Sequence, residues 1–202
     1  VDYAMPIASA QVKSAFLLAA LCADGVSRVK EPEQTRDHTE RMLCGFGHSI
    51  SLHDNWVSVI GGKQLVGANV VVPGDLSSAA FFIVGAAIGV DSQVVLSNVG
   101  INPTRIGVLE ILQKMGASIE CLSEKSICGE PTADLIVNSS PLKAVQIGAN
   151  QVARAIDEFP ILSIAAACAV GETTVCGAKE LRFKESDRIR SIISGLDRLG
   201  IS

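Results

Sequence analysis

Aromatic side chains and positive charge are both scarce in this sequence, and each scarcity limits what the chain can be. Phe, Trp and Tyr make up 4% of the 202 residues although 48% are hydrophobic, so the interior must be built mainly from Ala, Val, Ile and Leu. That composition favours closely packed helices. The net charge of −4 argues against a nucleic-acid partner, because nucleic-acid binders usually carry a basic excess. A basic cluster in such a protein indicates a small anionic ligand.

Long apolar runs are also missing. The longest uncharged run, residues 76–90, has fifteen residues with two Ser and two Gly. A membrane-spanning helix needs about 18 or more apolar residues. The first residues show no basic region followed by an apolar block, so we expect no signal peptide. We therefore expect a cytoplasmic globular protein with no membrane partner.

The cysteines and histidines do not form a metal-binding pattern. None of the six cysteines belongs to a Cys-x-x-Cys pair, and the three histidines lack the spacing of ligands on one helix. Cys121 and Cys128 could face each other across a hairpin, but a reducing cytosol disfavours a disulfide. We expect no metal site.

The chain contains an internal repeat. In each copy a nearly uncharged helical stretch ends at a Gly and is followed by a short strand, a polar loop with an Arg, and an amphipathic helix ending in a hydrophobic residue and Gly. The helical stretches are residues 15–23, 76–88 and 159–170. The spacing from Arg36, Arg105 and Arg188 to the closing Gly is eleven, eleven and twelve residues. Three matches in one order indicate a repeated structural unit.

Two further strands follow the amphipathic helix in the first two copies. They are expected at residues 48–52 with 56–60, and at 118–122 with 135–137. The unit therefore reads βαβαββ, which predicts an α/β fold. The third copy stops before these strands, and the first begins close to its buried helix. We expect the chain to be part of a longer protein.

The segment 181–189 carries a dense group of charged side chains at the start of an apolar helix. Lys and Arg are the side chains that bind phosphates and carboxylates, and proton transfer requires a carboxylate nearby. A site for a polyanionic substrate would explain the group. Taken alone, a solvated helix start capped by Ser186 and Asp187 explains it equally well.

The three buried helices begin with different polar residues. Ser9 and Ser78 are N-cap candidates. Pro160 fits a first helical turn, which places Asp157 at or just before a helix start. Capping is the ordinary role of Ser9 and Asp157, but a helix N-terminus also offers free backbone donors to a phosphate. Gln11 lies in such a first turn and can reach a bound ligand.

Six motifs occur in the same order as in the 5-enolpyruvylshikimate-3-phosphate synthase family, which the chain resembles from end to end. The motifs are Ser-Ala-Gln-Val-Lys-Ser (9–14), Arg-Asp-His-Thr-Glu-Arg-Met-Leu (36–43), Gly-Asp-Leu-Ser-Ser-Ala-Ala-Phe (74–81), Asn-Pro-Thr-Arg (102–105), Asp-Glu-Phe-Pro (157–160) and Lys-Glu-Ser-Asp-Arg-Ile (184–189). The first two are similar to the branch noted for glyphosate tolerance. The resemblance implies transfer of the enolpyruvyl group of phosphoenolpyruvate to the 5-hydroxyl of shikimate 3-phosphate, with release of phosphate and without a metal or organic cofactor.

The resemblance also implies two domains of repeated βαβαββ units with buried helices, an inside-out α/β barrel-like architecture. Residues 1–72 would form the last part of the first domain, and residues 73–202 most of the second. Family members are about twice as long, and some of their phosphoenolpyruvate contacts have no counterpart here. We therefore expect the 202-residue chain to be inactive alone, and the full-length protein to be a monomer.

The resemblance assigns a role to each matching residue. The implied contacts to shikimate 3-phosphate are Ser9, Ala10, Gln11, Arg36, Asp157 and Lys184; those to phosphoenolpyruvate are Gln11 and Arg188; the catalytic pair is Asp157 and Glu185. Asp157 resembles the carboxylate that binds the ring hydroxyls and takes the proton from the attacking one. Glu185 resembles the group that exchanges a proton with the methylene of phosphoenolpyruvate. Arg105 shares its repeat position with two of these residues, and we assign it a structural role.

Three other interpretations stay open. One is the related enzyme that transfers enolpyruvyl to UDP-N-acetylglucosamine on the same architecture, although the motifs at 9–11 and 184–188 favour shikimate 3-phosphate. Another is a non-catalytic fragment that binds ligand or assembles with other segments. The third is a structural repeat protein without a ligand, which does not explain why the polar motifs differ between copies.

Overall fold

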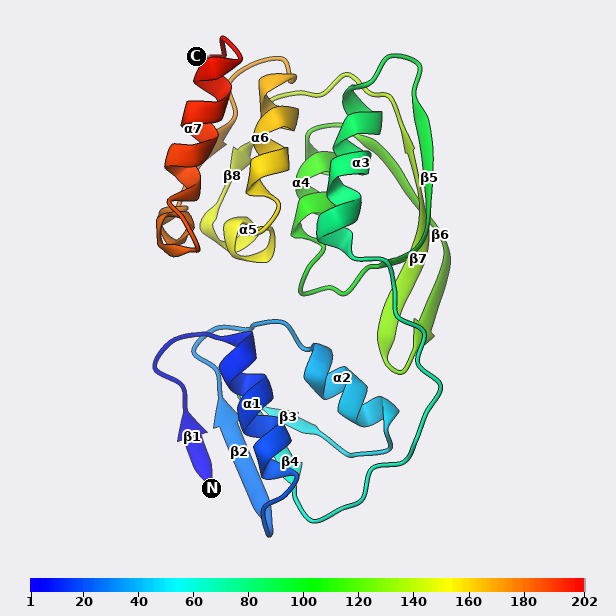
Figure 1. Ribbon diagram of the computed structural model, residues 1–202, viewed down its shortest axis with the longest axis vertical. Helices are drawn as coiled ribbons and strands as arrows, with labels where there is room; N and C mark the ends of the chain where they lie inside the picture. Colours follow the sequence, from blue (N-terminus) through cyan, green and yellow to red (C-terminus); the bar gives the residue numbers. More distant parts are fainter. Residues whose placement is uncertain (202) are drawn as a thin grey trace. The chain divides into compact units, whose positions relative to one another are not determined.

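The computed structural model of the chain describes residues 1–201, which fold into two compact units (Figure 1). The first unit comprises residues 1–72 and 125–131, and the second comprises the remaining described residues. Residues 125–131 are the tip of a hairpin. They join the first unit through contacts such as those of Arg41 Nη1 with Gly129 O at 2.9 Å and His38 Nδ1 with Glu130 Oε1 at 2.7 Å.

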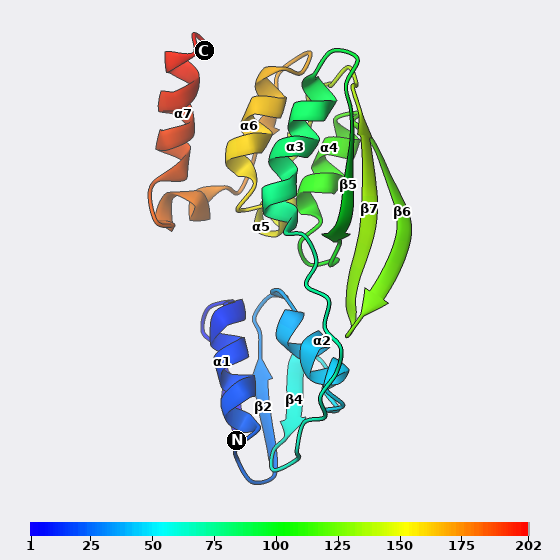
Figure 2. The same cartoon turned by 45° about the vertical axis from the view of Figure 1, so that its right-hand side comes forward.

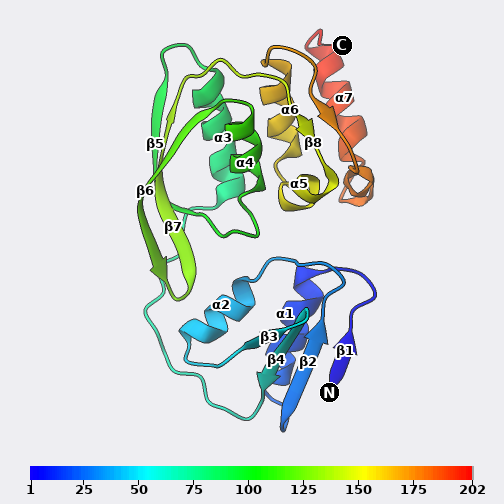
Figure 3. The ribbon, with the colours of Figure 1, turned by 180° about the vertical axis from the view of Figure 1, so that it is seen from behind.

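The first unit is one four-stranded sheet with two helices. Its elements are β1 (Asp2–Ala4), α1 (Ala10–Ala20), β2 (Val26–Lys30), α2 (His38–Gly45), β3 (Ser51–His53) and β4 (Trp56–Ile60). The strand order is β1-β2-β4-β3, with β1 parallel to β2 and the other pairs antiparallel. Figure 3 shows strands β2 and β4 with α1 on their far side. Leu17 of α1 packs there with Val29, Val57 and Val59 of the strands.

Helix α1 begins at Ala10, directly after the expected N-cap Ser9 and before the nearly uncharged stretch at residues 15–23. Ser9 has extended backbone angles, and its hydroxyl accepts a hydrogen bond from the amide of Val12, so it caps the helix. The earlier start brings Lys13 into the helix, where only 1% of this residue is exposed. Helix α1 therefore contains a buried lysine, which the uncharged stretch at residues 15–23 does not include.

The second unit contains the other two copies of the repeat. The second copy contains α3 (Leu76–Ile88), β5 (Gln93–Gly100), α4 (Gly107–Lys114), β6 (Ser118–Ile127) and β7 (Glu130–Asn138). The third contains β8 (Gln146–Ile147), α5 (Ala149–Arg154), α6 (Phe159–Ala167), β9 (Thr174–Val175), the 3₁₀ helix η1 (Lys179–Phe183) and α7 (Arg188–Arg198). The tip of the β6–β7 hairpin belongs to the first unit. Strands β5, β7 and β6 form a sheet in that order. Helices α3 and α4 lie on one face of it (Figure 2).

The same strand pairing recurs in each copy of the repeat. The strand before the buried helix is parallel to the strand after it: β1 with β2, the bridge of Gly74 with Val99, and β8 with β9. In the first two copies the second of these strands is antiparallel to the last one, as β2 is to β4 and β5 is to β7. The expected α/β class is thus confirmed.

Small aliphatic residues form the interior of the second unit, as the scarcity of aromatic residues implied. In α3, Ala80, Ile83, Val84 and Ala87 are each 0% exposed. Alanines allow a helix backbone to approach its neighbours closely, so α3 packs against both β5 and α6. Of the helices in residues 1–201, none combines the length and hydropathy that a bilayer crossing requires.

One expectation about local structure was wrong, and two short elements were not expected. Ser78 does not cap α3, because Asp75 does: the amide and hydroxyl of Ser78 both donate to Asp75 Oδ2, at 2.8 and 2.9 Å. Asp75 lies three residues before Ser78, the spacing at which an N-cap side chain accepts the amide of the third helical residue. Residues 146–154 form β8 and α5, which the sequence analysis did not include. These elements are too short to show a period.

Gly107 and Gly195 offer a matched test of helix packing. A Cβ on Gly107 would lie 2.7 Å from the carbonyl carbon and oxygen of Arg154, whereas a Cβ on Gly195 would meet nothing within 4 Å. We expect Gly107→Ala to destabilise the second unit by about 1–3 kcal/mol through overpacking. Gly195→Ala should stabilise α7 by roughly 0.5–1 kcal/mol, because alanine is the better helix former. Urea unfolding followed by circular dichroism measures both, and equal effects would contradict this packing.

Candidate active site

The sequence-predicted residues of the first unit lie at the start of α1 and on the loop after β2. Ser9 caps α1, Ala10 and Gln11 occupy its first two positions, and the side of the helix at Gln11 is exposed. The first amides of a helix lack partners within it and carry the positive end of the helix dipole. The start of this eleven-residue helix can therefore bind an anion, with the Ser9 hydroxyl as a further donor.

The loop with Arg36 runs from the end of β2 to α2 and is held by one carboxylate. Glu31 Oε2 accepts a hydrogen bond from the amide of Thr35 at 2.9 Å, and a second bond from the Thr35 hydroxyl. Arg36 follows directly and is half-buried. The backbone immediately before Arg36 is thus fixed by Glu31.

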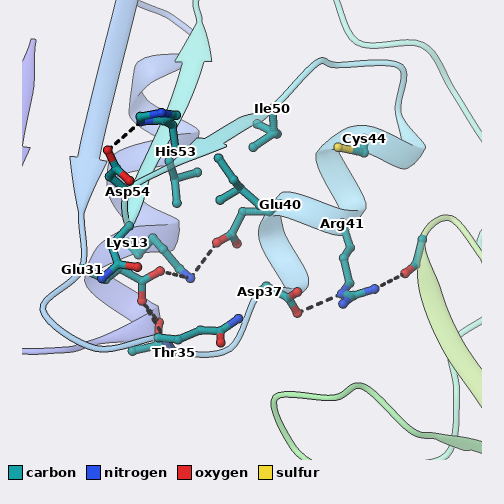
Figure 4. Close-up of a pocket in the computed structure, with 15 residues that line it drawn as sticks. Lys13, Glu31, Thr35, Asp37, Glu40, Arg41, Cys44, Ile50, His53 and Asp54 are labelled. Carbon is teal, nitrogen blue, oxygen red and sulfur yellow. Dashed lines mark hydrogen bonds and ion pairs between the residues drawn. The ribbon is translucent and has the colours of Figure 1, made fainter.

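A buried ion cluster lies beneath this loop, and the sequence analysis missed it. Lys13 Nζ is 2.6 Å from Glu31 Oε1 and 2.6 Å from Glu40 Oε1 (Figure 4). We call Lys13, Glu31 and Glu40 the lysine cluster. It borders a cavity of about 580 Å³ that Thr35 and Arg41 also line. The one signal in the sequence was a lysine within an otherwise apolar helix.

In the second unit, Arg188 joins both of the expected catalytic carboxylates. Its Nε and Nη2 each donate to a different oxygen of Glu185, both at 2.9 Å. Its Nη1 donates to Asp157 Oδ1 at 3.1 Å and to the carbonyl of Ile156 at 2.8 Å. The structure thus brings together three residues that the sequence analysis selected. The fourth, Lys184, forms an ion pair with Glu180 of η1.

This arrangement sets the electrostatics of Glu185. Hydrogen bonds from Arg188 lower the pKa of Glu185, and the same bonds raise the pKa of Arg188. Glu185 is therefore a carboxylate at neutral pH while Arg188 holds it. Its neighbour Asp187 caps α7 by accepting the amide of Arg190 at 3.0 Å, and that bond lowers the pKa of Asp187. The start of α7 thus contains an ordinary cap beside the Arg188 site.

Asp157 lies one residue before the N-cap of α6, which is Glu158. Glu158 is 5% exposed and accepts a hydrogen bond from the hydroxyl of Ser77. Arg105 donates to Ser77 Oγ at 2.7 Å and to Asp75 Oδ1 at 3.0 Å. Burial acts to raise the pKa of Asp75, but its bonds from Ser78 and the charge of Arg105 outweigh burial and lower it. Ser77 therefore joins the start of α3 to Glu158, the residue beside Asp157, and both of these contacts of Arg105 are to the start of α3.

Comparison with known proteins identifies the family. A model of EPSP synthase (3-phosphoshikimate 1-carboxyvinyltransferase) matches residues 1–202. The chain belongs to the EPSP synthase family. The 3-phosphoshikimate 1-carboxyvinyltransferases of Methylococcus capsulatus and Alkalilimnicola ehrlichii are 56% and 55% identical to it over 100% of the chain, which covers 46% and 45% of those relatives.

Solved structures support the fold of this EPSP synthase family member. An EPSP synthase from Acinetobacter baumannii superposes with a TM-score of 0.93 at 55% identity, over 98% of this chain and 44% of that one. The enolpyruvyl transferase NikO from Streptomyces tendae matches with a TM-score of 0.63 at 18% identity, over 79% of this chain and 37% of its own, which shows a shared fold alone. The chain spans less than half the length of the relatives it matches.

The link between Arg188 and Glu185 can be tested by titration. Arg188→Gln removes the guanidinium that donates two hydrogen bonds to Glu185, so the pKa of Glu185 should rise toward its ordinary value. Carboxyl chemical shifts followed by NMR against pH measure this change. Asp187 is the control, because the amide of Arg190 and the side chain of Arg182 lower its pKa instead. An unchanged pKa of Glu185 would show that Arg188 does not hold it.

Proposed function

We propose that this chain forms part of an EPSP synthase, which transfers the enolpyruvyl group of phosphoenolpyruvate to the 5-hydroxyl of shikimate 3-phosphate and releases phosphate. The observation that carries the proposal is the contact of one arginine with two carboxylates, Asp157 and Glu185. An arginine that binds an anionic substrate and two nearby carboxylates that move protons are the groups such a reaction requires. The names of the relatives support the same activity.

The first unit contributes the contacts to the phosphate of shikimate 3-phosphate. In our proposal, the capped start of α1 donates backbone N–H groups and the Ser9 hydroxyl to that phosphate. Arg36 adds a guanidinium, whose planar fork fits two phosphate oxygens at once. Gln11, exposed in the first turn, contacts the ring and phosphoenolpyruvate. Lys184 of the second unit is assigned to shikimate 3-phosphate as well.

Arg188 binds phosphoenolpyruvate in this proposal, and its present contacts suggest how. Glu185 now occupies two of its donors, as a substrate carboxylate would. Binding of phosphoenolpyruvate would replace Glu185 at those donors. Loss of the hydrogen bonds from Arg188 would raise the pKa of Glu185, because those bonds are the main cause that lowers it. Glu185 would then hold a proton more readily at the moment the substrate needs one.

The two carboxylates divide the proton transfers. Asp157 takes the proton of the attacking hydroxyl as its oxygen bonds to carbon 2 of phosphoenolpyruvate. Glu185 gives a proton to carbon 3, which turns the methylene into a methyl group and yields a tetrahedral intermediate. The C–O bond to phosphate then breaks, and Glu185 takes a proton back from the methyl group to restore the double bond. The proton on Asp157 leaves with the phosphate, so the reaction balances without a cofactor.

The catalytic roles can be tested in a completed enzyme, in which this chain is joined to the remaining segments of the Methylococcus capsulatus relative. Asp157→Ala and Glu185→Ala should each lower kcat by roughly 10²–10⁴-fold, the usual contribution of a general acid or base. Both side chains are at least one-third exposed, so the melting temperature should change little. Asp197→Ala, which removes an exposed carboxylate from α7, is the matched control. Near-normal turnover in either variant would remove that residue from the mechanism.

The 202-residue chain alone should not release phosphate from the two substrates at a measurable rate. It spans less than half of each relative, and the family resemblance assigns several cationic contacts to phosphoenolpyruvate to segments that have no counterpart in it. Each lost contact of about 1.4 kcal/mol slows the reaction tenfold. A phosphate-release assay of the chain, repeated after the remaining segments are added, tests this expectation. Titration with shikimate 3-phosphate separately shows whether the chain binds without catalysis, and turnover by the chain alone would refute the prediction.

A further inference from the structure

The lysine cluster joins three separate elements at a buried point of the first unit. Lys13 comes from the first turns of α1, Glu31 directly follows β2, and Glu40 comes from α2; these residues are 1%, 6% and 5% exposed. One lysine nitrogen faces the carboxyl groups of two glutamates, so three ionisable side chains meet in the interior. Removing charged groups from water costs free energy that an apolar core does not lose. Replacement of a buried ion pair by well-packed apolar residues therefore often leaves a protein equally stable. Stability alone does not account for this cluster.

Two members of the lysine cluster, Lys13 and Glu31, lie close to groups that we assign to phosphate binding. The amide of Lys13 donates to the carbonyl of Ser9 at 3.0 Å, which places the backbone of Lys13 one turn beyond the helix cap. Glu31 accepts both bonds from Thr35, the residue before Arg36. A second tie joins the helices, because the hydroxyls of Ser14 and Thr39 are 2.7 Å apart. Both ends of the loop that carries Arg36 are therefore fastened to α1.

We propose that the lysine cluster and Thr35 are positioning residues that set the place of Arg36 relative to the start of α1. Two groups that bind the same phosphate must be held at a fixed separation. Hydrogen-bonded ion pairs depend on direction as well as distance, so they fix this separation more closely than apolar contacts do. The inference rests on the proposed role of Ser9 and Arg36 in binding shikimate 3-phosphate. None of the three cluster residues touches the substrate in this scheme.

Glu31 is the decisive member because its two oxygens have different partners. Oε1 accepts from Lys13, while Oε2 accepts from the amide and hydroxyl of Thr35. A glutamine has one acceptor oxygen and one donor NH₂ group, so it can serve Lys13 or Thr35 but not both. Glu40 differs, since its Oε1 meets Lys13 and its Oε2 has no hydrogen-bond partner among the described residues. Glutamine at position 40 can keep the contact to Lys13.

These contacts predict unequal effects from one chemical change. In the completed enzyme, Glu31→Gln should raise KM for shikimate 3-phosphate about tenfold or more while kcat changes by less than about threefold. Glu40→Gln should raise that KM by less. Thr35→Val should raise it because the hydroxyl donor is lost, and Thr35→Ser should restore it. KM for phosphoenolpyruvate, measured at saturating shikimate 3-phosphate, should stay close to its original value in all four variants.

Leu17→Ala provides the control for instability. Leu17 is 0% exposed in the core of the first unit, so its truncation lowers the melting temperature without touching the loop. It should leave KM for shikimate 3-phosphate unchanged. If Glu31→Gln behaved like Leu17→Ala, with a lower melting temperature and an unchanged KM, the cluster would be structural and the inference would fail. If Glu31→Gln does not fold, Thr35→Val and Thr35→Ser provide the test instead. An unchanged KM for shikimate 3-phosphate in Thr35→Val would overturn the inference.

Failure of the proposed function gives a different result. If the unaltered completed enzyme does not convert shikimate 3-phosphate, the functional proposal fails before any variant is compared. If it is active, equilibrium binding of inorganic phosphate offers a second readout. Glu31→Gln should weaken phosphate binding in parallel with the rise in KM, and equal phosphate affinity in the two proteins would refute positioning by Glu31.

Discussion

The backbone N–H groups in the first turn of a helix need hydrogen-bond partners outside it, and this constraint places polar side chains along the chain. Helix α1 meets it with Ser9, α3 with Asp75 and α7 with Asp187, each of which accepts an amide three residues later. The N-cap of α6 makes no such side-chain bond, and its Glu158 accepts from Ser77 instead. For this reason, polar side chains occur at the starts of helices whose other residues are mainly aliphatic. The candidate binding residues lie at these same places.

One repeated position has taken different partners in different copies. Arg105 closes on Asp75 and Ser77 within the second copy. Arg188, at the equivalent place in the third, joins Asp157 to Glu185. Asp75 also caps α3, whereas Glu185 caps no helix within residues 1–201 and its side chain is 67% exposed. The repeat thus places an arginine at the same position in both copies, and its contacts differ between them.

The charges of the two units differ in how firmly they are held. Lys13 and its two glutamates are almost wholly buried, so that cluster can change little without loss of the surrounding packing. The Glu185 side chain is 67% exposed, and its pairing with Arg188 is open to competition from solvent and ligand. A rigid charged support beneath one binding element and an exchangeable ion pair in another are suited to different tasks. In our proposals, the first fixes the geometry of phosphate binding and the second is replaced by the substrate.

The sequence by itself determined the features that depend on neighbours along the chain. The repeat, the α/β class and the motifs at helix starts follow from spacing and residue type, because capping and hydrophobic periodicity act over three or four residues. Ser9 and Asp187 were identified as cap candidates for this reason.

Tertiary structure decided which distant charges meet. Lys13 pairs with Glu31, 18 residues away, and Arg188 with Asp157, 31 residues away, because packing of the elements brings them together. Local pattern could not reveal that Asp75 rather than Ser78 caps α3, since both residue types favour that position and only the backbone geometry selects one. The burial of Lys13 was equally hidden, because a lysine is tolerated inside a fold only when its partners are supplied by other elements.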